Sequence, residues 1–111
     1  MVQCYRVKLV LHIPHYAWEN DQLVKIDYTY FKEYLYKQFE EIGLMSWYST
    51  DARGYYKGRE FAEELLTVFC HKEIRDVVID VFRRTYFELR AVMRQEAFAY
   101  ECSGVLYVVA L

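Results

Sequence analysis

The segment DARGYYKGRE, residues 51–60, gathers several groups that could bind a ligand. It holds two of the chain's four glycines, two adjacent tyrosines and three basic side chains. Glycines let backbone N–H groups approach an anion, basic side chains supply charge, and tyrosine rings offer stacking faces. The same composition is typical of a β-hairpin turn in which Gly54 and Gly58 adopt positive φ angles and the charged residues stay in water. The sequence leaves both interpretations open.

As a binding site, this segment would contact an anionic small molecule or an acidic protein partner. The residues expected to form the site are Arg53, Gly54, Tyr55, Tyr56, Lys57, Gly58 and Arg59. The function that the sequence favours first is therefore that of a non-enzymatic, oligomeric protein that senses a ligand or binds a partner and acts as a regulator.

A second function class, a small enzyme of the dimeric ferredoxin-like barrel type, depends on His12. Histidine is the side chain most often used as a general base, and Tyr48 or Glu96 would have to lie beside it. A histidine at a subunit interface is the simpler interpretation. We expect no metal ion and no cofactor, because the sequence contains no P-loop, Rossmann glycine run or HExxH motif.

A third function class is binding of single-stranded nucleic acid, which the alternation of basic and aromatic residues between Arg53 and Lys57 favours slightly. The net charge of −2, with both signs scattered along the chain, argues against it, because such a balance gives no long-range attraction to nucleic acid or to an anionic membrane. No apolar run approaches the ~20 residues needed to span a bilayer. The sequence therefore predicts no membrane association and argues against nucleic acid as a partner.

The first half of the chain predicts a strand followed by a helix. From Tyr5 to Ile13 apolar residues recur at every second position, which is typical of a half-buried strand that Pro14 would end. From 21 to 42 the apolar spacing changes to three and four residues, which predicts a helix. Asn20 or Asp21 would cap its N-terminus, and Gly43 stands where a helix C-terminus favours glycine.

The second half predicts three further strands around a second helix, and then a terminal strand. The expected strands cover 44–52, 60–70 and 90–101, with a helix over 71–89 and a last strand at 105–111. Ser103 and Gly104 suit the tight turn before that last strand. The order is that of an α+β, ferredoxin-like βαββαβ fold: one antiparallel sheet, both helices on one face, and an extra C-terminal strand. We expect one such domain over residues 1–111.

The other face of this sheet would have no cover. We expect that open face to carry Arg6, Lys8, Val10, His12, Tyr48, Glu64, Arg94, Glu96, Phe98 and Tyr100. Aromatic residues make up 19% of the chain, more than a small core can hide, and tyrosine is enriched at protein interfaces. We therefore predict a homo-oligomer, a dimer or trimer, assembled through the open face and the apolar strand 105–111. Three widely spaced cysteines and the absence of a signal peptide indicate a cytoplasmic protein with reduced thiols.

Residues 31–82 resemble the PII-like superfamily of trimeric, ferredoxin-like signal proteins. FEEIGLMSWYSTDARG is similar to that family's helix end, second strand and first loop glycine, and YYKGREF is similar to the segment beyond the loop. The resemblance implies that Tyr56, Lys57 and Gly58 belong to a partner-sensing loop and that Gly54 lies near a ligand. The chain also resembles short-looped bacterial families of unknown function with a G-Y-[WY]-K-G hairpin and a late Gln-Glu pair, here Gln95-Glu96.

Overall fold

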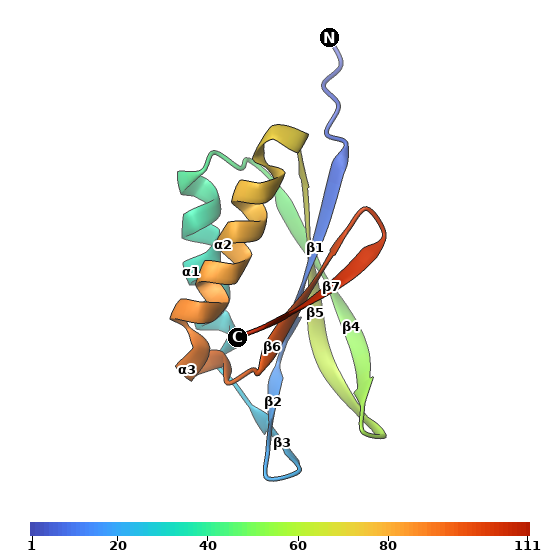
Figure 1. The fold of residues 1–111 in the computed structure, drawn as a ribbon, viewed down its shortest axis with the longest axis vertical. Helices are drawn as coiled ribbons and strands as arrows, with labels where there is room; N and C mark the ends of the chain where they lie inside the picture. Colours follow the sequence, from blue (N-terminus) through green and yellow to red (C-terminus); the bar gives the residue numbers. More distant parts are fainter.

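A computed structural model describes residues 1–111 and has the α+β fold that the sequence predicts. Figure 1 shows the elements in space. The strands are β1 (Val7–Pro14), β2 (Tyr16–Glu19), β3 (Gln22–Lys25), β4 (Trp47–Tyr56), β5 (Arg59–Cys70), β6 (Ala97–Cys102) and β7 (Val105–Ala110). The helices are α1 (Tyr28–Glu41), α2 (Arg75–Glu88) and the single turn α3 (Arg90–Met93), and a 3₁₀ turn, η1 (Lys72–Ile74), precedes α2.

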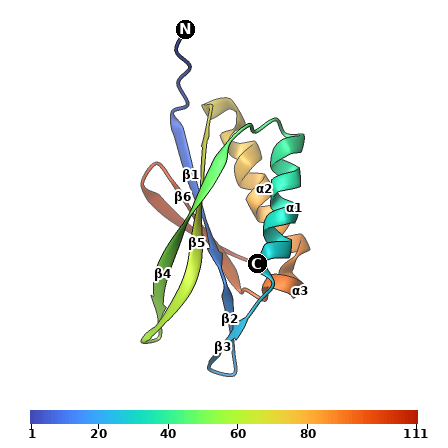
Figure 2. The same cartoon turned by 180° about the vertical axis from the view of Figure 1, so that it is seen from behind.

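Five of the strands form one antiparallel sheet in the order β4-β5-β1-β6-β7. Both long helices cover the same face of this sheet and leave the other face open (Figures 1 and 2). This arrangement confirms the predicted ferredoxin-like pattern with an extra terminal strand. The sheet's middle strand, β1, lies between β5 and β6, so its side chains are positioned by neighbours on both sides.

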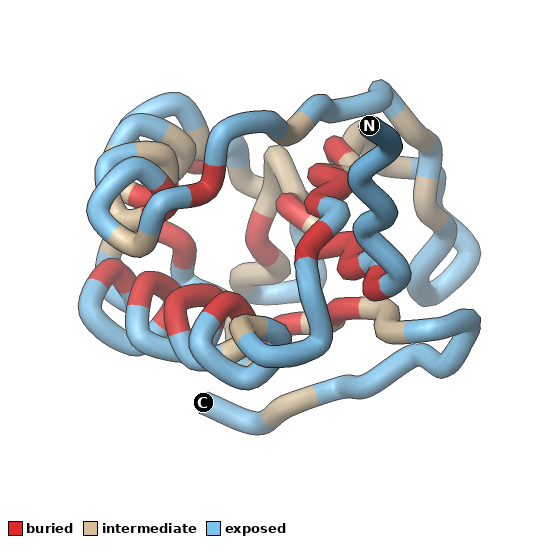
Figure 3. Tube along the Cα trace, turned by 90° about the horizontal axis from the view of Figure 1, so that it is seen from above, coloured by how far each residue is buried: buried red, intermediate tan, exposed pale blue.

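The core lies between the helices and the covered sheet face, where the buried residues gather in Figure 3. Leu9, Leu11 and Ile13 of β1 are fully buried, as their period-two spacing predicts. They pack against apolar side chains that recur every three or four residues on the helices: Phe31, Leu35, Phe39, Val78, Val81, Phe82 and Tyr86. Gly43 ends the first helix with a φ of 83°, in the left-handed conformation expected of a glycine there.

The predicted start of the first helix is wrong. Residues 16–25 form a separate hairpin, β2 and β3, in which Trp18 pairs with Leu23 and Glu19 with Gln22. Asn20 and Asp21 are its two turn residues, with φ angles of 52° and 59°, rather than helix caps. The two paired positive φ angles are those of a hairpin turn that asparagine and aspartate tolerate. The helix begins at Tyr28, and the Asp27 side chain caps it by accepting from the Tyr30 N–H.

The predicted strand 90–101 is also wrong in its first half. Residues 90–93 form the helical turn α3, which ends where Arg94 adopts a left-handed φ of 51°, and β6 begins only at Ala97. Ser103 and Gly104 form the predicted tight turn, with φ angles of 53° and 80°.

The predicted open face is shifted by one residue on two strands. Glu64, Phe98 and Tyr100 lie on the helix-covered face and are buried. The open face instead carries Glu63 and Glu101, their neighbours in sequence, while Arg94 and Glu96 lie in the connection before β6. Alternation fixes which residues share a face, and a shift of one residue exchanges the two sets.

The sheet has a gap between β1 and β6. Their pairing covers three positions and ends at Leu11 and Tyr100. The next backbone carbonyl along β1, that of His12, accepts a hydrogen bond from the Tyr86 hydroxyl of α2 at 2.7 Å. A buried polar side chain thus satisfies a backbone group that β6 leaves unpaired, as buried backbone groups require. Beyond this point β1 and β6 diverge, and the space between them is accessible from the open face.

The terminal strand β7 is one of the two sheet edges, and it is apolar and exposed. Val105, Leu106, Tyr107 and Val108 keep between 45% and 68% of their surface in solvent. No helix of the structure is long and apolar enough to cross a membrane.

Candidate functional site

The gap between β1 and β6 opens into a cleft of about 610 Å³. The end of β1, the β2–β3 hairpin, the β4–β5 hairpin and the start of β6 form its walls. His12 and Glu63 lie in it on adjacent strands, since the residue opposite His12 on β5 is Leu65, two positions from Glu63. The cleft forms where the pairing of β1 with β6 ends and where the β2–β3 and β4–β5 hairpins extend beyond the end of that pairing.

His12 lies between two carboxylates in this cleft. Its Nε2 is 2.8 Å from an oxygen of Glu101, and its Nδ1 is 3.7 Å from Glu63 Oε1. The histidine and Glu63 side chains keep 25% and 15% of their surface exposed, so water still reaches the group.

The electrostatics of the group favour a charged imidazole. The Glu63 carboxylate and, less strongly, the Glu101 carboxylate raise the pKa of His12 above its ordinary value of 6.5, against the opposing effect of partial burial. An imidazolium between two carboxylates carries a net charge of −1. The group of Glu63, His12 and Glu101 therefore has a surplus of negative charge at one side of the cleft.

Aromatic side chains form the outer part of the cleft. The Trp18 ring of the β2–β3 hairpin meets the Tyr56 ring of β4 edge to face, with 5.6 Å between the ring centroids. Lys57 Nζ lies 5.8 Å from the centroid of Trp18 and 5.5 Å from that of Tyr56. This cation–π contact joins the tips of the two hairpins across the mouth of the cleft.

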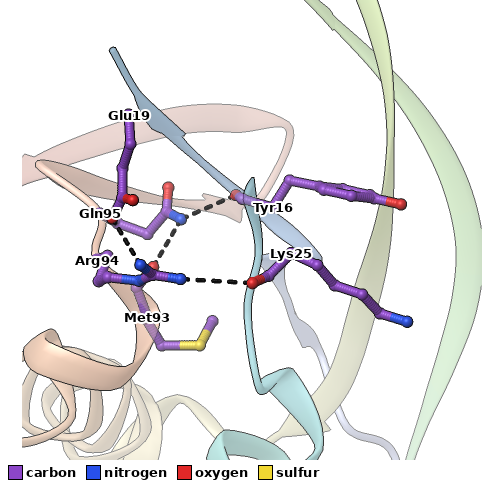
Figure 4. Close-up of polar contacts among 6 residues, drawn as sticks. All are labelled: Tyr16, Glu19, Lys25, Met93, Arg94 and Gln95. Atoms are coloured by element: carbon purple, nitrogen blue, oxygen red, sulfur yellow. Dashed lines mark hydrogen bonds and ion pairs between the residues drawn. The ribbon is translucent and has the colours of Figure 1, made fainter. Parts of the chain in front are cut away.

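The β2–β3 hairpin is held in place by the connection between α3 and β6 (Figure 4). Arg94 Nη1 donates to Glu19 Oε1 at 2.7 Å, and the same guanidinium reaches the carbonyl of Lys25. The Gln95 amide donates to the Tyr16 carbonyl at 3.0 Å and to the Met93 carbonyl at 2.9 Å. These bonds fix the wall that carries Trp18 against the start of β6.

Only part of the predicted ligand segment reaches this cleft. Tyr55, Tyr56 and Lys57 line it. Arg53, Gly58 and Arg59 do not, because the segment is mainly a strand ladder in which Arg53 pairs with Ala62 and Tyr56 with Arg59. The turn is reduced to Lys57 and Gly58, both with positive φ. Gly54 lies within β4 without a positive φ, so its predicted turn role is wrong.

The residues predicted beside His12 lie in different places. Glu96 lines the same cleft, whereas Tyr48 lines a separate apolar cavity of about 540 Å³ near the start of β1. The carboxylates that contact His12, those of Glu63 and Glu101, were missed. The signal that could have found Glu63 is the apolar set Leu66, Val68 and Cys70: its members share a face with Glu64 and so place Glu64 inside and Glu63 outside.

A second histidine–glutamate cluster lies on the covered face of the sheet. Glu64 Oε1 accepts from His15 Nε2 at 3.2 Å and from Lys32 Nζ at 3.1 Å, and its Oε2 forms an ion pair with Lys32 at 2.9 Å. The His15 ring also stacks on Tyr28, with 3.7 Å between centroids. This cluster ties the end of β1 to the first turns of α1. No group of three or more His, Cys, Asp or Glu side chains is arranged to hold a metal ion.

Comparison with known proteins gives a likeness of fold. No family model matches the sequence, and no curated protein matches it either. Among solved structures, a phage SAM lyase without ligand is 13% identical, with a TM-score of 0.57 over 95% of this chain and 89% of that one. A phage SAM lyase in complex with S-methyl-5′-thioadenosine is 11% identical, with a TM-score of 0.55 and the same coverage.

These likenesses overturn the prediction of a non-enzymatic sensing or partner-binding regulator. The fold, shared over nearly the whole of both chains, is that of an enzyme in each case, which also contradicts the expectation that the protein is not an enzyme. The prediction of a ligand site in the 53–60 segment stays a prediction, and three of its residues, Tyr55, Tyr56 and Lys57, line the cleft beside His12. The PII-like resemblance stays a prediction, since no family model supports it.

Proposed function

We propose that the protein is an enzyme that binds S-adenosylmethionine, or a closely related sulfonium nucleoside, in the His12 cleft and releases S-methyl-5′-thioadenosine. The observation that carries this proposal is the pair of carboxylates around His12, with His12 and Glu63 lining an aromatic-walled cleft and Glu101 contacting His12 from β6. The likeness in fold to two phage SAM lyase structures, one of them with S-methyl-5′-thioadenosine bound, supports it.

The charge of the cleft fits such a substrate. S-adenosylmethionine carries a positive sulfonium and a positive ammonium group beside one carboxylate, and opposite charges attract strongly in a partly desolvated cleft. The net negative group of Glu63, His12 and Glu101 would face the sulfonium and ammonium groups. Lys57 forms no ion pair within the chain and lies at the mouth of the cleft, near the tip of the β4–β5 hairpin.

The reaction breaks the bond between the sulfur and the γ carbon of the amino-acid part. The electron pair of that bond stays on the sulfur, which becomes neutral, and the γ carbon needs a new pair. The pair comes from the substrate's own carboxylate, which closes a lactone, or from a Cβ–H bond, which needs a base and leaves a double bond. Because both imidazole nitrogens of His12 already face carboxylates, at 2.8 and 3.7 Å, neither nitrogen is free to take a proton from the substrate, and we favour lactone closure.

We further propose that the protein is a homo-oligomer that works in the cytoplasm. The exposed apolar residues of β7 and the unpaired edge of that strand support assembly, since an open apolar edge tends to pair with another chain. The three cysteines are unpaired in the structure, and reduced thiols are the rule in the cytoplasm.

The test is incubation of the purified protein with S-adenosylmethionine, with the nucleoside products separated by chromatography and identified by mass. We expect S-methyl-5′-thioadenosine and a four-carbon product, and proton NMR distinguishes the lactone from its unsaturated isomer. Glu101→Gln should slow the release, whereas Glu60→Gln, an exposed glutamate near the tip of β5, should leave it unchanged. Absence of S-methyl-5′-thioadenosine from the wild-type reaction would refute the proposal.

A further inference from the structure

We propose that Phe61 is the platform on which the cleft holds the purine base of its substrate; this inference rests on the proposed function and assigns one part of the same site. Phe61 of β5 lies directly opposite Gly54 of β4 in the strand ladder. A Cβ atom at position 54 would lie 2.4 Å from the end of the Phe61 ring, closer than a real Cβ approaches any neighbour.

The contact shows how the ring is oriented. Because the ring end lies above the Cα of Gly54, Phe61 extends sideways across β4 instead of standing upright from the sheet. Gly54 has no positive φ, so its backbone conformation does not require glycine. The need for glycine here comes from the phenylalanine ring, a form of cross-strand packing known for glycine and aromatic residues in sheets.

The ring then offers a flat apolar surface inside the cleft, which Phe61 lines. Trp18 and Tyr56 are less suited to this task, since Lys57 lies over both of their rings. An aromatic face stacks well on any nucleobase. Phe61 is thus a ring of the cleft that is supported from behind by the backbone of Gly54 and is not covered by a cation of the chain.

The position of Phe61 along β5 also agrees with the chemistry of the cleft. Phe61 and Glu63 are two residues apart on the same face, a spacing of ~7 Å along a strand. A base stacked on Phe61 would direct its sugar and 5′ sulfur along the strand toward Glu63 and His12. In one adenosyl compound the base would then contact the Phe61 ring, and the sulfonium would lie beside the Glu63 carboxylate.

The test is binding of S-methyl-5′-thioadenosine, measured by calorimetry. We expect Phe61→Leu to weaken binding roughly tenfold or more, as loss of a base–aromatic stack does. Phe61→Tyr should retain binding. Phe69→Leu is the matched control, because Phe69 lies on the same face of β5 but lines the other cavity. Binding of S-methylmethionine, a sulfonium without a base, should change less than about twofold in Phe61→Leu, since no stacking contact is lost.

A second variant guards against a folding defect. Gly54→Ala adds one methyl group under the ring, should displace it and should weaken S-methyl-5′-thioadenosine binding while the circular dichroism spectrum stays unchanged. If Phe61→Leu and Gly54→Ala bind S-methyl-5′-thioadenosine as the wild type does, Phe61 is not the platform, even where the wild type cleaves S-adenosylmethionine. If the wild type neither binds the nucleoside nor cleaves S-adenosylmethionine, the proposed function has failed and this inference falls with it.

Discussion

Two adjacent glutamates of β5 show how one residue type serves two purposes on opposite faces of a sheet. Glu63 faces the open side and meets His12, whereas Glu64 faces the helices and meets His15 and Lys32. The Glu64 side chain is 8% exposed and contacts two positive or hydrogen-bonding partners within 3.2 Å. The Glu63 side chain, at 3.7 Å from its histidine, still has space around it.

The difference separates a structural cluster from a candidate active site. Lys32 and His15 lower the pKa of Glu64, although burial acts more strongly than either in the opposite direction, so this carboxylate stays charged with its partners inside the chain. The group around His12 has more negative than positive charge, and it borders a cleft. The Glu64 cluster, in which the charges match, stabilises the fold. The His12 group has a surplus of negative charge beside a cleft, so it favours binding of a positively charged ligand.

The largest expected effect is on stability, at Glu64. Glu64→Gln removes the negative charge from a buried cluster and leaves Lys32 without its counter-ion. We therefore expect the free energy of unfolding to fall by about 3 kcal/mol. Glu63→Gln should cost less than about 1 kcal/mol, as for a solvent-accessible pair. Urea unfolding of both variants measures the difference. Equal losses would show that the two faces do not differ in the way described.

The next effect is on activity, where we expect the substitution of Glu63 to matter more than that of Glu64. Glu63→Gln removes a negative charge from the proposed substrate site, and we expect kcat/KM for S-adenosylmethionine to fall about 100-fold, which is ~2.7 kcal/mol of transition-state stabilisation. Steady-state release of S-methyl-5′-thioadenosine gives the value. Glu64→Gln, measured at a temperature where it is fully folded, should retain most of the wild-type rate.

A smaller effect should appear in the dependence of stability on pH. The raised pKa of His12 contributes stability fully below its ordinary value of 6.5, and this contribution is lost as pH rises through the higher folded value. The lowered pKa of Glu64 acts in the opposite sense: its contribution is present above 4.5 and is lost as pH falls through the lower folded value. Denaturant midpoints of His12→Gln should therefore differ from those of the wild type most at pH 6 and below. A difference that grows toward alkaline pH would contradict the arrangement around His12.

The smallest effect concerns the contact between the hairpin tips. Lys57→Ala removes a cation–π contact at an exposed position, and we expect a loss of about 0.5 kcal/mol in stability. If Lys57 also contacts the substrate at the mouth of the cleft, KM should rise several-fold with little change in kcat. Thermal unfolding and initial-rate measurements test the two statements separately.

The sequence predicts the sheet and the two long helices because their apolar residues follow clear periods of two and of three to four. It does not predict the β2–β3 hairpin, since YAWEN and QLVKI are too short to show a period, and Asn20-Asp21 suits a helix cap as well as a turn. His12 could be chosen from its type and its place on a strand. Its partner Glu63 could have been found from Leu66 and Val68, which share a face with Glu64 and place Glu63 on the other one. Glu101 could not, because the aromatic and charged residues around it do not show which face of β6 is buried.

The short seam between β1 and β6 has a consequence for how the molecule opens. The hairpin of β6 and β7 is joined to the rest of the sheet by three residue pairs with β1, and it packs on α2 through Phe98 against Tyr86 and Tyr100 against Phe82. Such a segment can detach as one cooperative unit while β1, β4 and β5 stay paired. Amide hydrogens of β6 should therefore exchange with deuterium together and earlier than those of β5. Such a partial opening would separate Glu101 of β6 from His12 of β1 and widen the cleft, so detachment of this hairpin would set the rate at which a bound product is released.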